Sequence, residues 1–241
     1  MPKIPFSPEA EHINPQIGKI KLRELRLDRV EAHYVALQKN GLSPRGVRYV
    51  HSILHKSLND AIRRGFATYN AAHGAILPRL DFKEMVFLDA DEVLQFLITA
   101  QESPYHALYT LAIKTGMRKG ELLALKWSDI NWQSGTIRVQ RQVQRIKGQG
   151  LIFRSPKTRA GRRTILLGEK TLEALRKQLE QANLLKNLAG DYWEEHDLIF
   201  PSTVGTPLGG SNLSKDFKAH LEKAGVKKIR FHDLRHTAAS L

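Results

Sequence analysis

The sequence predicts a mainly helical α+β protein in which helices accompany one small antiparallel β-sheet. Three observations support this class. Apolar residues recur at helical spacing through most of the chain. Strand-like stretches separated by turns are found only in residues 135–167. With 241 residues, 41% of them hydrophobic, the chain is long enough for two modest domains or one large one.

Residues 1–72 are predicted to form a helical domain. One helix is expected over residues 23–39 and a second over residues 44–64. The dipeptide Ser43-Pro44 supplies the second helix with an N-cap and a first-turn proline. Glycine and proline then break the helical pattern, so residues 73–88 are predicted to be a linker between two domains.

Residues 89–241 are predicted to form the second domain, which contains the sheet. It opens on Asp89 as an N-cap, and Glu92 three residues later completes a capping box. A helix over residues 104–115 ends at Gly116. The other expected elements are helices over 117–126, 171–188 and 211–223, strands over 135–144, 151–157 and 162–167, and a last helix from 231 onward.

The charge balance points to a polyanionic partner. Lys and Arg number 38 against 24 Asp and Glu, which gives a net charge of +14. Residues 1–80 alone have 13 basic and 6 acidic side chains, so the first third of the chain carries half of that net charge. Nucleic acid is the partner that explains such a balance most simply, and a generically basic surface is the alternative.

The predicted helix 44–64 separates apolar and basic side chains onto opposite faces. Its apolar face consists of Val47, Val50, Leu54, Leu58 and Ala61. The opposite face carries Arg45, Arg48, Lys56 and Arg63, with only Asp60 near its edge. Because ordinary solvated faces mix positive and negative charges, we expect this one to follow the phosphates of a nucleic acid. An ordinary solvated face remains the alternative.

Several kinds of site are not expected. The chain has no cysteine, no complete nucleotide-binding glycine loop and no HExxH motif. His51 and His55 have the spacing of a metal pair but lack the glutamate of a metalloprotease, and Arg235 beside His232 and His236 would repel a cation. No metal or cofactor is therefore predicted. No signal peptide or membrane-length apolar segment is recognisable, so a cytoplasmic protein without a membrane partner is expected.

Three short stretches carry candidate catalytic residues. "TGMRKGELLALKWSDI" contains Arg118 and, one turn later, Glu121. "SPKTRAGRRTILL" places Lys157 near a turn between two strands. The terminal "HDLR" sets His232 and Arg235 three residues apart on one helix face. Taken singly, these residues could be a surface ion pair, a solvated turn lysine and a helix cap.

Together, and in this order, the three stretches closely resemble the catalytic domain of the tyrosine recombinases, the phage-integrase family of site-specific DNA recombinases. The resemblance implies that Arg118, Lys157, His232 and Arg235 are catalytic and that Glu121 supports them. Residues 12–64, with "HINPQIGKIKLREL" as a lead-in, resemble that family's helical core-binding domain. The partners implied are double-stranded DNA carrying a core-type recombination site and further recombinase subunits. No cofactor is implied.

The chemistry of DNA strand exchange explains why these residue types are suitable. A phosphodiester is negatively charged, and this charge becomes more concentrated in the transition state. Two guanidinium groups, those of Arg118 and Arg235, can bind non-bridging oxygens and offset it. Lys157 can protonate the leaving 5′-oxygen as a general acid, and His232 can accept the nucleophile's proton or hold the phosphate.

The resemblance also implies that the recombinase pattern is incomplete in this chain. In the family the arginine box is followed by another His or Trp and then by the nucleophilic tyrosine. All six tyrosines here precede residue 231, so we expect a chain that binds DNA through a core-binding domain shortened at its start but does not cleave by itself. One alternative is a non-catalytic DNA-binding regulator. Another, a metal-dependent transposase or nuclease, needs clustered carboxylates, which Glu121, Asp129 and Asp233 do not convincingly provide.

Overall fold

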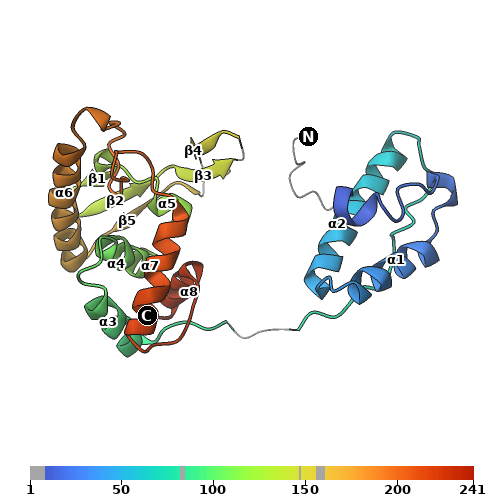
Figure 1. The fold of residues 1–241 in the computed structure, drawn as a ribbon, viewed down its shortest axis with the longest axis horizontal. Helices are drawn as coiled ribbons and strands as arrows, with labels where there is room; N and C mark the ends of the chain where they lie inside the picture. The colour runs from blue at the N-terminus through green and yellow to red at the C-terminus, as the bar shows by residue number, and fades with distance from the viewer. Residues whose placement is uncertain (1–8, 82–84, 147, 156–160) are drawn as a thin grey trace. The chain divides into compact units, whose positions relative to one another are not determined.

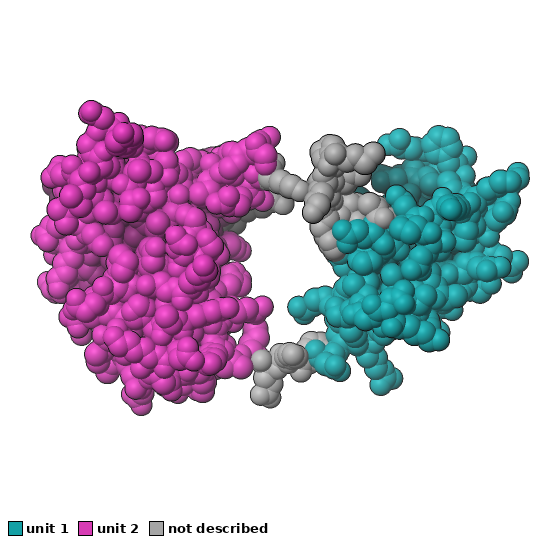
Figure 2. All heavy atoms as spheres, in the orientation of Figure 1, with its two compact units in different colours: residues 1–83 teal, residues 84–241 magenta. Residues whose placement is uncertain are grey.

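The computed structural model describes residues 9–81, 85–146, 148–155 and 161–241 of the chain. The chain divides into two compact units, Met1–Lys83 and Glu84–Leu241 (Figures 1 and 2). The division falls inside the segment 73–88 that the sequence marks as a linker. Each unit has a hydrophobic core of its own.

Unit 1 is built on two helices, α1 (Leu27–Lys39) and α2 (Pro44–Arg63), preceded by a π-helical turn over Glu9–Ile13 and a 3₁₀ turn over Leu22–Glu24. The prediction that the first helix starts at residue 23 is wrong. The backbone is extended at Leu25 and Arg26. Leu25 is buried in the core, and its carbonyl accepts a hydrogen bond from the Tyr69 hydroxyl at 2.7 Å. These tertiary contacts oppose a continuous helix.

The second helix begins as its sequence predicts. Pro44 occupies the first turn, and the Ser43 hydroxyl accepts a hydrogen bond from the Gly46 amide at 3.1 Å. The apolar face of α2 packs with α1 to form the core of unit 1. The largest fully buried side chain of this core is Tyr34 of α1, whose hydroxyl lies 2.9 Å from Nδ1 of His51.

Unit 2 opens with α3 (Ala90–Thr99), α4 (His106–Thr115) and the single turn α5 (Lys119–Leu122). The Asp89 capping box is present as predicted, with both of its hydrogen bonds at 3.0 Å. Helix α4 is almost wholly buried and contacts both α6 and α8. The expected helix over 117–126 is limited to α5, since Lys126 lies in an isolated β-bridge with Leu198.

The strands form two antiparallel sheets, where the sequence predicted one. Strands β1 (Ile130–Asn131), β2 (Thr136–Val139) and β5 (Arg163–Leu166) make one sheet in the order β1-β2-β5. Strands β3 (Gln142–Ile146) and β4 (Gly150–Arg154) form a separate hairpin.

The break between the two sheets lies at Gln140 and Arg141. Both side chains donate hydrogen bonds to the buried carboxylate of Asp129, that of Gln140 at 2.7 Å. This acid directly precedes β1 and lies outside the predicted strand, so the local pattern of residues 135–144 gives no sign of it.

Three further helices complete unit 2: α6 (Glu169–Ala189), α7 (Gly210–Lys223) and α8 (Leu234–Ser240), the last preceded by a 3₁₀ turn over Phe231–Asp233. The rings of Phe96, Tyr109, Phe217 and Phe231 pack at centroid distances of 5.2–6.3 Å at the centre of the unit. The predicted α+β class, mainly helical, is confirmed. None of the helices in the described residues is long and apolar enough to cross a membrane.

Candidate phosphate-binding site

The site is built around the segment that joins α4 to α5. Gly116 ends α4 in the left-handed conformation, with φ of 59°. Arg118 is then extended and caps α5, and its backbone amide donates to Oε2 of Glu121 at 3.0 Å. Its guanidinium donates to Oε1 of the same carboxylate at 3.1 Å while the side chain remains 55% exposed. Arg118 is therefore held at one edge and open to solvent.

The second arginine reaches the same segment from the far end of the chain. Helix α8 packs against α4, and Nη1 of Arg235 donates to the Gly116 carbonyl at 2.9 Å. A Cβ atom on Gly116 would lie 3.8 Å from Cγ of Arg235 and 3.4 Å from Cβ of Ala238. The fold thus places Arg235 one hydrogen bond from the turn that carries Arg118, although more than a hundred residues separate them in sequence.

Glu121 lies behind Arg118 and is only 4% exposed. A third arginine, Arg163 of β5, donates to its Oε2 at 2.8 Å and to its Oε1 at 3.4 Å. Burial by itself would raise the pKa of Glu121, but the hydrogen bonds from Arg163 and Arg118 outweigh it and leave the pKa below its usual value. Glu121 is accordingly ionised and forms ion pairs with both Arg118 and Arg163.

Sequence reasoning missed Arg163. In the strand "RTIL", Arg163 and Ile165 are half-buried while Thr164 and Leu166 are exposed. The letters alone do not distinguish these two faces, because Ile165 and Leu166 are both apolar. A half-buried arginine is stabilised by an acidic partner. Identifying Glu121 as that acid required the tertiary structure.

Of the other two predicted catalytic residues, His232 is among the described residues and Lys157 is not. His232 is exposed in the 3₁₀ turn before α8, which the buried ring of Phe231 anchors. Within the described part of the chain, its ring contacts that of His236, at a centroid distance of 6.5 Å, and makes no hydrogen bond. Lys157 lies outside the described residues, in the connection from β4 to β5.

The predicted basic face of α2 is only partly free. Arg45 and Lys56 are exposed and form no ion pair among the described residues. Arg48 instead donates from Nε to the Pro78 carbonyl at 2.9 Å, and Arg63 pairs with Asp60. The exposed ridge of the helix, at alternating spacings of four and three residues, consists of Arg45, Tyr49, Ser52, Lys56, Asn59 and Arg63. Tyr49, Ser52 and Asn59 were missed because only charge was considered.

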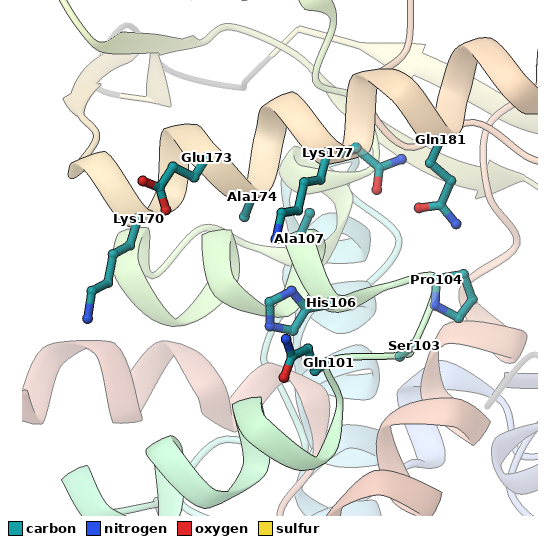
Figure 3. A pocket seen from close by; sticks show the side chains of 11 residues that line it. Gln101, Ser103, Pro104, His106, Ala107, Lys170, Glu173, Ala174, Lys177 and Gln181 are labelled. Atoms are coloured by element: carbon teal, nitrogen blue, oxygen red, sulfur yellow. The ribbon is translucent and has the colours of Figure 1, made fainter.

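A hollow of about 320 Å³ lies elsewhere in unit 2, between the start of α4 and α6 (Figure 3). The side chain of Lys177 extends toward His106 in it, and burial, together with this lysine, lowers the pKa of His106. The lining also contains Glu173, so its charge is mixed. None of the predicted site residues lines this hollow. No group of three His, Asp or Glu side chains able to hold a metal ion is found in the residues that the structure describes.

Comparison with known proteins connects this geometry to a family. The model of the Phage integrase family matches residues 86–241. The integrase of Streptomyces ambofaciens is 31% identical over 240 residues, covering 96% of this chain and 61% of that relative. The integrase of Saccharopolyspora erythraea is 26% identical over 289 residues, covering 96% and 65%. The chain therefore spans less than two thirds of the length of these curated relatives.

Solved structures show the same fold. The Tn1549 transposon integrase in complex with circular intermediate DNA aligns with a TM-score of 0.78 at 17% identity, covering 93% of this chain and 75% of that one. The lambda integrase dimer bound to a COC′ core site aligns with a TM-score of 0.65 at 23% identity, covering 97% and 79%. Since the family match extends over more than half of the sequence, this chain belongs to the phage integrase family.

Proposed function

We propose that the chain acts in site-specific DNA recombination, in which it binds duplex DNA and holds the phosphodiester at which strands are exchanged. The observation that carries this proposal is the meeting of Arg118 and Arg235 at the turn after α4. Both side chains approach one short segment, and Arg118 presents an open guanidinium edge. Two arginines so placed are suited to the non-bridging oxygens of one phosphate.

The reaction proposed is a transesterification. A tyrosine oxygen attacks the phosphorus, the bond to the 5′-oxygen breaks, and a 3′-phosphotyrosyl DNA and a free 5′-hydroxyl result. None of the six tyrosines of this chain is assigned that role, so we propose that the chain does not cleave by itself. The arginines offset the charge that builds up on the non-bridging oxygens. Lys157 is proposed to protonate the leaving 5′-oxygen, and His232 to accept the tyrosine proton or hold the phosphate.

The printed names of the relatives support duplex DNA and further recombinase subunits as partners. Both curated relatives are called integrases, and the two solved neighbours were determined on DNA, lambda integrase as a dimer. Because the structural neighbours are less than 25% identical, they support the fold and not a particular DNA sequence. We place the reaction in the cytoplasm, where the DNA of such bacterial relatives is found.

The test uses the strand-joining half of the reaction, for which the protein need not supply a tyrosine. A nicked duplex, chosen from a random library for binding to the chain, carries a 3′-p-nitrophenyl phosphate at the nick and a 5′-hydroxyl opposite it. Attack of the 5′-oxygen on phosphorus forms the phosphodiester and expels p-nitrophenolate. Ligation is read on a denaturing gel and phenolate release by absorbance.

We expect the chain to accelerate this ligation, and Arg118→Ala and Arg235→Ala each to slow it by about 10²–10³, the range for loss of one charge-stabilising donor. The matched control is Arg176→Ala, which removes an exposed arginine of α6 that stacks over Trp132. Tight binding without any acceleration would contradict the recombinase proposal. It would favour the second candidate, a non-catalytic DNA-binding regulator, whose candidate DNA-binding surface is the exposed ridge of α2.

A further inference from the structure

Glu121 creates an electrostatic problem for a phosphate site. Its carboxylate accepts a hydrogen bond from the Arg118 guanidinium at 3.1 Å and cancels one positive charge at the point where a phosphate would bind. Because Glu121 is 4% exposed, water screens that negative charge poorly. An Arg118–Glu121 pair alone would therefore offer a phosphate little net attraction.

Arg163 supplies a second positive charge beside Glu121, on the more buried side of the carboxylate. Its side chain is 30% exposed against 55% for Arg118, so the two guanidiniums flank the carboxylate as an inner and an outer partner. With Arg163 included, the three side chains carry a net charge of +1. The charge removed by Glu121 is thereby restored, and Arg235 adds one more.

Arg163 also fixes the carboxylate in space. Each oxygen of Glu121 accepts from both sides: Oε1 from the Arg118 and Arg163 side chains, and Oε2 from the Arg118 backbone amide and Arg163. Arg163 itself sits on β5, paired in register with Val139 of β2. A carboxylate held on all sides cannot rotate, so the Arg118 guanidinium that it orients keeps one direction.

We propose that Arg163 is a positioning residue of the phosphate site: it offsets the charge of Glu121 and immobilises the carboxylate that aims Arg118 at the DNA. The inference rests on the function proposed above. It extends the site by an arginine that need not touch the DNA.

The first test is a set of three variants in the ligation assay at saturating DNA. Arg163→Gln removes the charge and should slow ligation by about 10–100-fold, the range known for losing the hydrogen-bonding partner that orients a metal ligand, which we carry over to the residue that orients Arg118. The DNA concentration for half-maximal rate, taken from a separate titration, should change little, because contacts along the rest of the duplex dominate DNA binding. Arg163→Lys keeps the positive charge but cannot donate the two parallel hydrogen bonds, so its ligation rate should lie between those of the unchanged chain and Arg163→Gln. Glu121→Gln combined with Arg163→Gln restores the net charge, so it should be faster than Arg163→Gln alone.

The matched control is Arg141→Gln. Arg141 also pairs with a buried acid, Asp129, and is 23% exposed. Its loss should lower the melting temperature without slowing ligation by bound protein. If Arg163→Gln and Arg141→Gln behave alike in melting and rate, or the double variant is no faster than Arg163→Gln, the positioning role is overturned.

A second test separates this inference from the proposed reaction. Inorganic phosphate is titrated into the chain without DNA while the Nε–H resonance of Arg118 is followed by NMR. Arg163→Gln should raise the apparent Kd for phosphate, and the double variant should lower it again. That result supports the role of Arg163 even if the unchanged chain proves unable to ligate. An unchanged Kd in Arg163→Gln overturns it even where ligation is fast.

Discussion

At the scale of single residues, Gly116 links the backbone to the site. Its φ of 59° is costly for any residue with a Cβ, although the added Cβ itself would make only ordinary contacts, at 3.4 Å from Ala238 and 3.8 Å from Arg235. The residue therefore ends α4, and its carbonyl accepts the hydrogen bond of the second arginine. Glycine is favoured here by the backbone conformation and not by lack of space.

Gly116→Ala is expected to lower the free energy of unfolding by about 1–2 kcal/mol, from the left-handed backbone. It should also slow ligation, because a backbone that relaxes from the left-handed conformation turns the Gly116 carbonyl that holds Arg235. Gly225→Ala is the control, since Gly225 has φ of 67° at the end of α7 and nothing within 4 Å of its added Cβ. Urea denaturation should report similar losses for the two variants. Equal ligation rates in both would show that the direction of the Gly116 carbonyl does not matter for the site.

Glu121 gives a pH dependence whose sign is fixed. Its pKa is lowered in the folded state, so its ion pairs stabilise unit 2 fully above the ordinary value of 4.5, and this contribution is lost as the pH falls below it. Glu121→Gln should therefore flatten the loss of stability between about pH 5 and pH 3, measured by thermal unfolding. Glu102→Gln, which alters an exposed acid without an ion pair among the described residues, should leave that slope unchanged.

At the scale of elements, α2 combines a buried apolar face with an exposed ridge of hydrogen-bonding and basic side chains. The structure revises which arginines are available there. Arg48 is directed to the Pro78 carbonyl and Arg63 to Asp60, whereas Arg45 and Lys56 remain free to meet phosphates.

Replacing Arg45 and Lys56 by Glu should weaken DNA binding and flatten its salt dependence. Each lost phosphate contact should reduce the slope of log affinity against log salt by roughly 0.9. Fluorescence anisotropy at several salt concentrations gives this slope. Lys223→Glu, which reverses an exposed charge at the end of α7, serves as the control. A slope unchanged by the α2 variants would place the DNA-binding face on another element.

At the scale of the whole molecule, the chain has two cores that share no residue. The core of unit 1 is formed mainly by α1 and α2, and that of unit 2 gathers around α4. Separate cores predict separate cooperative transitions.

Leu54→Ala should lower the stability of unit 1 by about 2–5 kcal/mol and leave that of unit 2 unchanged, since Leu54 is buried in the first core. Phe217→Ala, in the second core, should lower the stability of unit 2 by about 3–5 kcal/mol and leave that of unit 1 unchanged. Hydrogen exchange followed by mass spectrometry reads the two units in one experiment. A loss of protection spread over both units in either variant would mean that they unfold as one.

The sequence by itself determined the features that depend on neighbouring residues. The start of α2 at Pro44, the Asp89 capping box and the end of α4 at Gly116 all follow from contacts within one helical turn. The α+β class follows from the spacing of apolar residues along the chain. The family resemblance, and not physics, selected Arg118 and Arg235 as catalytic candidates.

Only the tertiary structure decided the features that depend on partners outside the same helix or strand. Burial of Leu25 delays α1, and the buried Asp129 divides the sheet between β2 and β3. Arg163 pairs with Glu121, 42 residues away in sequence, and Arg235 donates to the Gly116 carbonyl, 119 residues away. Local patterns encode which residues prefer a helix, a strand or a turn. Which buried charge pairs with which arginine is settled only when separate elements pack and each buried polar group must find a partner.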